Sequence, residues 1–185
     1  IIAVCGYHGW HDWYAASLKY HPGVPPFMEN VIRTFQYNDV MSLRKILRDD
    51  VAAVIMEPVL HEAPENGFLA ECRRLAELVG ALFILDENVT GFRVGLGGAQ
   101  GYYAITQALA VFGKAMSNGF PLAAIVGRRA ILARGEYISG TFGGETVSLA
   151  AAKATIKVYK DTGCIPRMHQ LGVRLLGALR EILSD

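Results

Sequence analysis

The sequence has no marked excess of charge of either sign and no hydrophobic run long enough to cross a membrane. Its formal net charge is +1, and like charges do not cluster along it. Attraction to nucleic acid or to an anionic membrane surface requires many cations on one face, so we expect neither partner. The longest apolar runs, such as residues 51–56, have the length of a buried strand, whereas a membrane-spanning helix needs about 20 apolar residues.

Cysteine is scarce, and its arrangement argues against a disulfide framework and against a metal centre. The three cysteines, Cys5, Cys72 and Cys164, are an odd number, and none belongs to a Cys-x-x-Cys pair. Disulfide-stapled domains usually carry an even number of cysteines, so reduced thiols in a cytoplasmic setting are the better interpretation. His8 and His11 offer two metal ligands, but no third ligand is evident, so we expect no metal site.

What the sequence does have is a regular alternation of short apolar runs with amphipathic stretches. Apolar runs bounded by polar or turn residues predict strands at residues 1–5, 31–35, 51–57, 82–86, 109–112 and 122–126. Apolar residues three and four apart predict helices at residues 39–48, 68–79, 128–134, 148–159 and 168–183. Strands that alternate with helices predict an α/β fold with a mostly parallel sheet. In such sheets ligands gather at the carboxyl ends of the strands, where Glu57 and Asp86 stand.

Lys114 comes directly after an apolar strand and a glycine, where a solvated lysine is unusual. Desolvation lowers the pKa of a lysine and frees its amine as a nucleophile, which is what imine chemistry needs. A lysine at a strand end can also lay its stem along an apolar surface and keep its charge in water. Lys114 by itself therefore leaves both interpretations open.

Asp86 ends the apolar run of residues 81–85 and brings a carboxylate to the carboxyl end of a strand. A buried carboxylate beside a pyridinium nitrogen keeps that ring protonated and lets it act as an electron sink. The same position suits a helix cap or a metal ligand, and Asp86 with Glu87 would suit Mg²⁺ in a nucleotide-binding protein. However, the phosphate loop Gly-x-x-x-x-Gly-Lys-Ser/Thr is missing, and residues 95–101 lack the Gly-x-Gly-x-x-Gly register. We expect residues 95–101 to be a connecting loop.

A series of motifs carries a resemblance to a known family. Residues 85–93 read Leu-Asp-Glu-Asn-Val-Thr-Gly-Phe-Arg, and residues 112–124 read Phe-Gly-Lys-Ala-Met-Ser-Asn-Gly-Phe-Pro-Leu-Ala-Ala. Both segments resemble the class III aminotransferases, above all the branch that contains glutamate-1-semialdehyde aminomutase and its aminotransferase relatives, which shares this spacing of aspartate and lysine. Tyr-His-Gly at residues 7–9, Glu-Pro-Val at 57–59 and Gly-Thr-Phe-Gly-Gly-Glu at 140–145 are similar to further family signatures, in the expected order.

The resemblance implies the large domain of a fold-type-I enzyme that uses pyridoxal 5′-phosphate (PLP), with a mixed, mostly parallel sheet sandwiched by helices. Lys114 would form a Schiff base with the cofactor, and Asp86 would keep the ring nitrogen of the cofactor protonated. The implied activity is that of a transaminase, which moves an amino group from a small-molecule donor to a carbonyl acceptor. Glutamate-1-semialdehyde aminomutase activity and a non-catalytic PLP-fold fragment stay open as alternatives, although Thr-Phe-Gly-Gly-Glu at residues 141–145 favours the other aminotransferases.

The resemblance also implies further cofactor contacts. Tyr7 would stack on one face of the cofactor ring, and Asn88 stands at the second face, where the family usually has an apolar residue. His8 would hold the strand-end aspartate by a hydrogen bond. Thr141 would reach the cofactor phosphate of the neighbouring subunit, which implies a homodimer, and Glu62 would lie near the phenolic oxygen of the cofactor and the substrate. The residues alone explain Tyr7 equally well as a core aromatic, His8 as a core histidine and Thr141 as part of a plain turn. For Glu62, an exposed acid in a loop is the better interpretation from the residues alone.

A division of the chain follows from the same resemblance. Residues 1–162 would be the PLP-binding large domain without its N-terminal part, and residues 163–185 a helix that leads toward a truncated C-terminal small domain. Glycine and proline at residues 163–166 are expected to break the helical pattern there. The chain opens within a predicted strand, so the glycine-rich phosphate loop that the family has ahead of Tyr-His-Gly would lie outside it.

Overall fold

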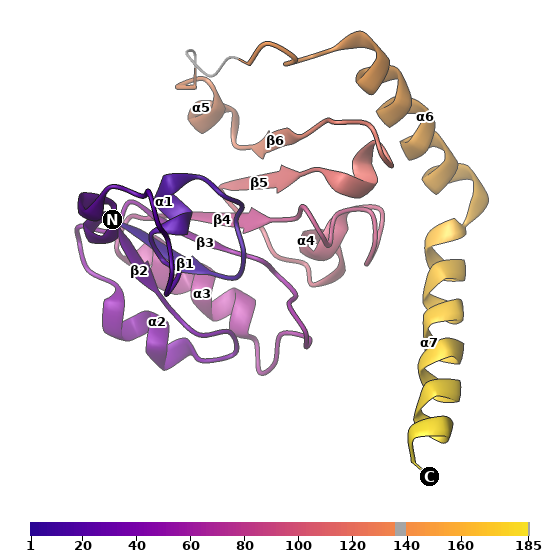
Figure 1. Ribbon diagram of the computed structural model, residues 1–185, viewed down its shortest axis with the longest axis horizontal. Helices are drawn as coiled ribbons and strands as arrows, with labels where there is room; N and C mark the ends of the chain where they lie inside the picture. Colours follow the sequence, from indigo (N-terminus) through magenta and orange to yellow (C-terminus); the bar gives the residue numbers. More distant parts are fainter. Residues whose placement is uncertain (136–139, 185) are drawn as a thin grey trace.

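The computed structural model describes residues 1–135 and 140–184, and its centre is a six-stranded mixed sheet (Figure 1). The strands are β1 (Ile2–Cys5), β2 (Ile32–Thr34), β3 (Ala53–Met56), β4 (Leu82–Asp86), β5 (Leu109–Phe112) and β6 (Ala124–Gly127). They lie in the order β2-β1-β3-β4-β5-β6, with β6 antiparallel to β5 and all other neighbours parallel. The α/β fold with a mostly parallel sheet, expected from the sequence, is confirmed.

Helices alternate with the strands. They are α1 (Asp12–Ala15), α2 (Val40–Ile46), α3 (Phe68–Leu78), α4 (Gly98–Tyr102), α5 (Arg129–Leu132), α6 (Thr146–Thr162) and α7 (Cys164–Leu183), with 3₁₀ helices η1 (Pro26–Val31) and η2 (Lys114–Met116). Five of them, α2, α3, α5, α6 and α7, lie where the periodic apolar residues predict a helix. Asp39 caps α2, since its side chain accepts a hydrogen bond from the backbone N–H of Ser42 at 3.0 Å. Gly80 follows α3 with φ 73°, a left-handed conformation that ends a helix without strain.

Two connecting segments differ from the expectation. Residues 95–101, expected to be a loop, contain most of the short helix α4. This helix forms because Glu87 accepts hydrogen bonds from its first amides, Ala99 N at 2.9 Å and Gln100 N at 2.7 Å. The break expected over residues 163–166 is narrower, since only Gly163, with φ 62°, separates α6 from α7. Pro166 lies in the first turn of α7, where its missing N–H removes no helical hydrogen bond.

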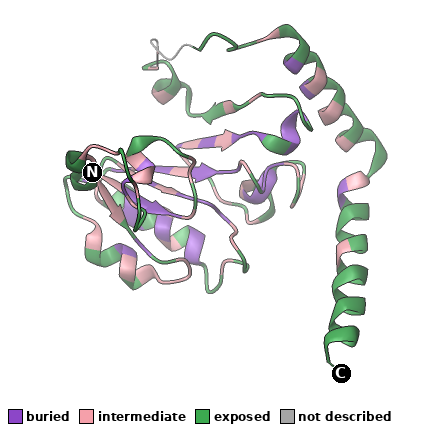
Figure 2. Cartoon of the chain, viewed as in Figure 1, coloured by how far each residue is buried: buried purple, intermediate pink, exposed green. Residues whose placement is uncertain are grey.

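The core lies between the sheet and the inner face of α3. This helix buries Phe68, Leu69, Cys72, Leu75 and Ala76, which recur at the spacing of one helix face. They join buried strand residues such as Phe83, whose burial contributes about 1.5–3 kcal/mol. Figure 2 shows buried residues concentrated in the central strands and α3, whereas α7 is exposed along most of its length. Within the described residues, no helix has both the length and the apolar character to span a membrane.

The carboxyl ends of the parallel strands meet at one edge of the sheet and set the position of the site. β1 leads into Gly6 and Tyr7, and β3 leads into Glu57. β4 ends at Asp86, and its neighbour β5 is followed after one glycine by Lys114. Residues far apart in the sequence therefore come together at this edge, which is where ligands bind in sheets of this kind.

Candidate active site

A cavity of about 250 Å³ opens at this edge of the sheet. Its lining consists of Tyr7, His8, Gly9, Trp10, His11, Glu57, Asp86, Asn88, Val89 and Lys114. Among the residues that the sequence singles out, Lys114, Asp86, Tyr7, His8 and Asn88 thus share one cavity. They come from three segments of the chain, residues 7–8, residues 86–88 and Lys114, and the pairing of the strands brings these segments together.

Asp86 is held on both carboxylate oxygens. Its Oδ2 lies 2.8 Å from Nδ1 of His8, and its Oδ1 accepts a hydrogen bond from the backbone N–H of Asn88 at 3.0 Å. Both side chains are removed from water, with His8 1% and Asp86 9% exposed. The other ring nitrogen of His8 lies 3.0 Å from the carbonyl oxygen of Cys5, which can only accept, so Nε2 carries a hydrogen. His8 therefore links the carboxylate of Asp86 to the backbone of Cys5.

Lys114 has an unusual backbone conformation after the end of β5. Its φ of 36° lies in the left-handed region, which costs a non-glycine residue on the order of 1 kcal/mol and occurs often at functional sites. The residue is exposed, so the chain alone does not remove its amine from water, in contrast to the desolvation expected from the sequence. The reason is that Lys114 follows the strand end and opens onto the cavity instead of the core.

Asn88 packs against the glycine that precedes Lys114. A Cβ atom at Gly113 would lie 2.1 Å from Oδ1 of Asn88, so no larger residue fits there while Asn88 keeps its place. Asn88 therefore supports the backbone that leads from β5 into Lys114, and it also lines the cavity. The polar residue that departs from the family pattern is accommodated because its neighbour has no side chain.

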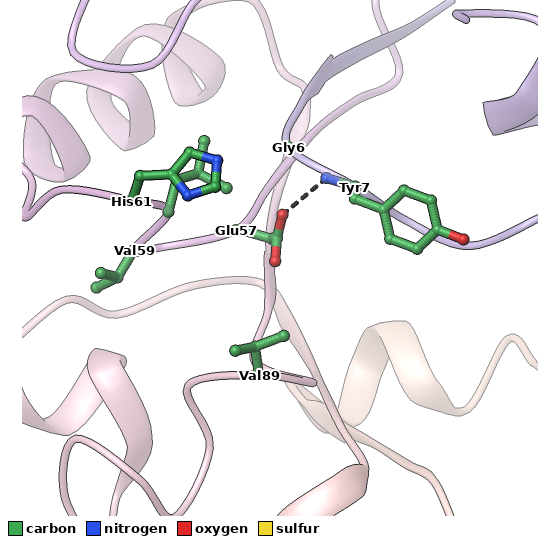
Figure 3. Close-up of a pocket in the computed structure, with 7 residues that line it drawn as sticks. Gly6, Tyr7, Glu57, Val59, His61 and Val89 are labelled. Carbon is green, nitrogen blue, oxygen red and sulfur yellow. Dashed lines mark hydrogen bonds between the residues drawn. The ribbon is translucent and has the colours of Figure 1, made fainter.

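Tyr7 lines this cavity and also a second one of about 530 Å³, whose lining residues are drawn in Figure 3. The second cavity is lined by Gly6, Tyr7, Glu57, Val59, Leu60, His61 and Val89. Tyr7 is 62% exposed and meets Tyr14 edge-on, with ring centroids 5.4 Å apart and planes at 83°. An exposed aromatic ring beside a cavity is available to stack on a planar ligand.

Thr141 and Glu62 are not among the residues that line the two cavities. Thr141 is exposed in the segment between β6 and α6, and Glu62 is exposed in the loop after β3. Thr141 is expected to act on the cofactor of a second subunit, so the geometry of one chain does not test that expectation. For Glu62, the exposed position agrees with the loop pattern around it.

Two carboxylates have contacts that the sequence pattern does not reveal. Glu57 is 9% exposed and lines both cavities, and its Oε2 accepts a hydrogen bond from the backbone N–H of Tyr7 at 2.7 Å. In the sequence, Glu57 is marked by its place at a strand end and by the Glu-Pro-Val motif at residues 57–59, but neither reveals this contact. Glu87 is fully buried and bonded to Thr90 Oγ1 at 2.5 Å and to the start of α4, so it does not pair with Asp86. In residues 1–135 and 140–184, no group of three potential ligands is placed to hold a metal ion.

Known proteins resemble this chain in both sequence and fold. The sequence model of the family Aminotransferase class-III matches residues 6–185. The chain is 38% identical to the glutamate-1-semialdehyde 2,1-aminomutase of Methanothrix thermoacetophila, over 97% of this chain and 46% of that protein. It is 40% identical to the 3-aminobutyryl-CoA aminotransferase of Cloacimonas acidaminovorans, over 85% of this chain and 40% of that protein. A solved transaminase with PLP bound superposes with a TM-score of 0.90 at 25% identity, over 99% of this chain and 49% of that chain.

These matches agree with the motifs in the sequence and with the sheet. The chain spans less than half the length of each of these proteins. Its mixed, mostly parallel sheet is the arrangement of fold-type-I PLP enzymes, as the superposition on the PLP-bound transaminase shows. Because the family model covers all but the first residues, the chain belongs to the class-III aminotransferases, a family of PLP-dependent enzymes.

Proposed function

We propose that this chain carries the PLP-binding centre of an aminotransferase, with Lys114 as the lysine that binds the cofactor. The observation that carries the proposal is that Lys114 and Asp86 line one cavity from the ends of the adjacent parallel strands β5 and β4. PLP chemistry needs an amine for the aldehyde of the cofactor and a carboxylate for its ring nitrogen, held within reach of one small ring. The proposed substrates are a small-molecule amino donor and a carbonyl acceptor.

The side chains of the cavity fit PLP in their chemistry. Asp86 is buried and held by two partners, so its remaining lone pairs can accept the proton of a ring nitrogen. Tyr7 offers an exposed aromatic ring for one face of the cofactor, and the amide of Asn88 offers a planar group for the other. When bound, PLP supplies an aldehyde that takes up amino groups and a ring that withdraws electrons.

Each residue then has a defined task. Nζ of Lys114 would hold the cofactor through its aldehyde carbon and, once displaced by an amino substrate, would be free to take the proton from Cα of the substrate. The same Nζ would then give that proton up again, so Lys114 would act first as a base and then as an acid. Asp86 would hold the proton on the ring nitrogen, and His8 fixes the orientation of the Asp86 carboxylate.

The assembly is part of the proposal. Thr141 would reach the phosphate of a neighbouring subunit's cofactor, so the active form would be a homodimer, and the exposure of Thr141 supports such a contact. Glu62 would approach the phenolic oxygen of the cofactor and the substrate from the loop after β3. Residues 1–162 would form the large domain and residues 163–185 would lead toward a small domain, which the interruption between α6 and α7 supports.

A cytoplasmic location is also proposed, on the basis of the cysteines. Cys5, Cys72 and Cys164 are all free thiols, which fits a reducing compartment.

Burial, reinforced by the charge of Glu57, raises the pKa of the Cys5 thiol to about 12. Cys5 therefore stays protonated near neutral pH and does not compete with Lys114 as a nucleophile beside the cavity.

Aminomutase activity is the second candidate, because the aminomutase of Methanothrix thermoacetophila matches 97% of this chain. In a transaminase the amino group passes to a second carbon skeleton, whereas in the aminomutase both amino exchanges involve one carbon skeleton. Incubation with an ¹⁵N-labelled amino donor and an unlabelled keto acid separates the two. Label in the product of the keto acid supports the transaminase, and label confined to the skeleton of the donor supports the aminomutase.

The test of the cofactor site is an absorbance titration of the purified chain with PLP, followed by reduction with borohydride and mass spectrometry. We expect a visible band of a covalent lysine adduct and, after reduction, a modified peptide that contains Lys114. Lys114→Ala should lose both, whereas Lys153→Ala, which removes an exposed lysine of α6, should keep both. An adduct that persists in Lys114→Ala, or no adduct in the unmodified chain, would contradict the proposal and favour a non-catalytic member of the family.

A further inference from the structure

We propose that Glu57 is a positioning residue for Tyr7, whose ring it holds in place over the cavity by fixing the backbone of that residue. The inference rests on the proposed PLP site, where Tyr7 covers one face of the cofactor. It adds a role for a buried carboxylate that the sequence marks as the end of a strand and as part of the Glu-Pro-Val motif at residues 57–59, with no role assigned. Its basis is the contact that joins β3 to the segment after β1, shown in Figure 3.

The contact between Glu57 and Tyr7 is short and tightly packed. Oε2 of Glu57 accepts the backbone N–H of Tyr7 at 2.7 Å, across 50 positions of sequence. The chain before Tyr7 approaches the same oxygen so closely that a Cβ atom at Gly6 would lie 2.6 Å from it. Glycine is therefore required at position 6 for two reasons, the close approach of Glu57 and the positive φ of 97°.

The segment that carries Tyr7 needs such an external support. Gly6 and Gly9 bracket Tyr7 and His8, and both glycines have positive φ, at 97° and 94°. Glycine imposes little restriction on the backbone, so the segment does not set its own direction. Two carboxylates from the sheet set it instead, since Glu57 binds the backbone of Tyr7 and Asp86 binds the imidazole of His8.

The ring of Tyr7 depends on this support because little else holds it. Tyr7 is 62% exposed and packs edge-on against Tyr14, a contact that limits the ring on one side only. Glu57 itself is 9% exposed, so the strength of its hydrogen bond is not lost to competing water. Without the carboxylate, the amide of Tyr7 loses its partner in a partly buried place and the segment gains freedom.

The experiment compares Glu57→Gln, which keeps an oxygen acceptor for Tyr7 N–H, with Glu57→Ala, which removes it. The first readout needs no cofactor: amide hydrogen exchange by NMR at Tyr7, with Val54 in β3 as the internal reference. The second is the dissociation constant for PLP from absorbance titration, in a cycle with Tyr7→Ala and the double variant. Glu65→Ala removes an exposed acid of the same connection and serves as the control. Glu57→Leu fills the space without an acceptor and is used if Glu57→Ala does not fold.

We expect exchange at Tyr7 to rise by about tenfold or more in Glu57→Ala while Val54 is unchanged, because only a local hydrogen bond is lost. Binding of PLP should weaken by about tenfold in Glu57→Ala and in Tyr7→Ala, and by no more in the double variant, because both remove the same stacking contact. Glu57→Gln should stay within about threefold of the unmodified chain, because it retains the acceptor.

Three results would overturn the inference. Exchange at Tyr7 that is unchanged in Glu57→Ala shows that the carboxylate does not hold the segment. Additive losses of PLP affinity in the double variant show that Glu57 acts on the cofactor independently of Tyr7. A loss in Glu57→Gln equal to that in Glu57→Ala shows that charge, and not the hydrogen bond, is what matters. If the unmodified chain binds no PLP, the proposed function fails, and exchange at Tyr7 still decides whether Glu57 holds the backbone.

Discussion

The edge of the sheet and the C-terminal helix α7 differ in how far the chain buries and hydrogen-bonds its own side chains. At the sheet edge, Asp86, His8 and Glu57 are buried or nearly so, and each is hydrogen-bonded to a segment distant in sequence. Along α7 most apolar side chains remain in water, with Leu175 61% exposed, and Ile165 in the first turn is the buried exception among the described residues. One chain is therefore enough to arrange the polar groups of the cavity. The apolar face of α7, in contrast, has no comparable burial within the described residues.

The largest effect, a loss of stability, should come from truncation of a buried side chain in the sheet. Leu85→Ala removes a fully buried side chain of β4 and should lower the free energy of unfolding by about 2–5 kcal/mol. Leu175→Ala makes the same chemical change on α7 and should cost less than about 1 kcal/mol, because an exposed side chain leaves no cavity. Urea unfolding followed by circular dichroism measures both. Equal losses in the free energy of unfolding would contradict the contrast between the two regions, because they would mean that α7 is packed in solution.

A second, smaller effect concerns Thr141, which lies on the C-terminal side and is proposed to act across a dimer. A lost hydrogen bond to the cofactor phosphate should weaken PLP binding by about tenfold in Thr141→Ala, but only where the chain is dimeric. PLP titration at two protein concentrations, with sedimentation velocity to establish the oligomeric state, provides the measurement. Thr162→Ala, at the other end of α6, is the matched control. The same loss in a monomeric sample would show that Thr141 acts within its own chain.

The smallest effect is expected at the surface, where a hydrogen bond between the charged side chains of Arg44 and Glu71 joins α2 to α3. Hydrogen bonds from Arg74 and then Arg44 lower the pKa of the Glu71 carboxyl from 4.5 to about 2. A carboxyl with a lowered pKa contributes stability above its unfolded value, and that contribution is lost as the pH falls from about 4.5 toward about 2. Arg44→Ala should raise the pKa of Glu71 and reduce the stability that depends on pH in this range.

An NMR pH titration of the Glu71 carboxyl in both proteins checks this, with Arg48→Ala, at the exposed end of the same segment, as the control. Because the pair is at the surface, the shift should also shrink at high salt. A titration curve of Glu71 that does not move in Arg44→Ala would mean that Arg74 alone holds the carboxyl, and α2 and α3 would then be joined by their apolar contacts only.

Much of the fold could be predicted because local patterns report local structure. The apolar run of residues 82–86 and the periodic residues of α3 are found where the sequence places them, since strands and helices bury side chains with fixed periods. Helix α4 could not be predicted from residues 95–101, because Glu87, the carboxylate that caps it, lies outside that segment. A capping residue that lies outside a segment leaves no periodic pattern of residues within that segment.

The candidate site divides in the same way. Asp86 and Lys114 are recognisable from strand ends and motifs, but their sequence does not show that Lys114 is exposed or that Asn88 Oδ1 crowds Gly113. The sequence by itself determined the order of strands and helices, the family, and the residue types that PLP chemistry needs. Only the tertiary structure decided which groups share the cavity. It also decided that Glu87 bonds to the start of α4, away from the cavity, and that Glu57 binds the backbone of Tyr7. Those outcomes depend on strand pairing and on hydrogen bonds between distant segments, and no local period in the sequence encodes them.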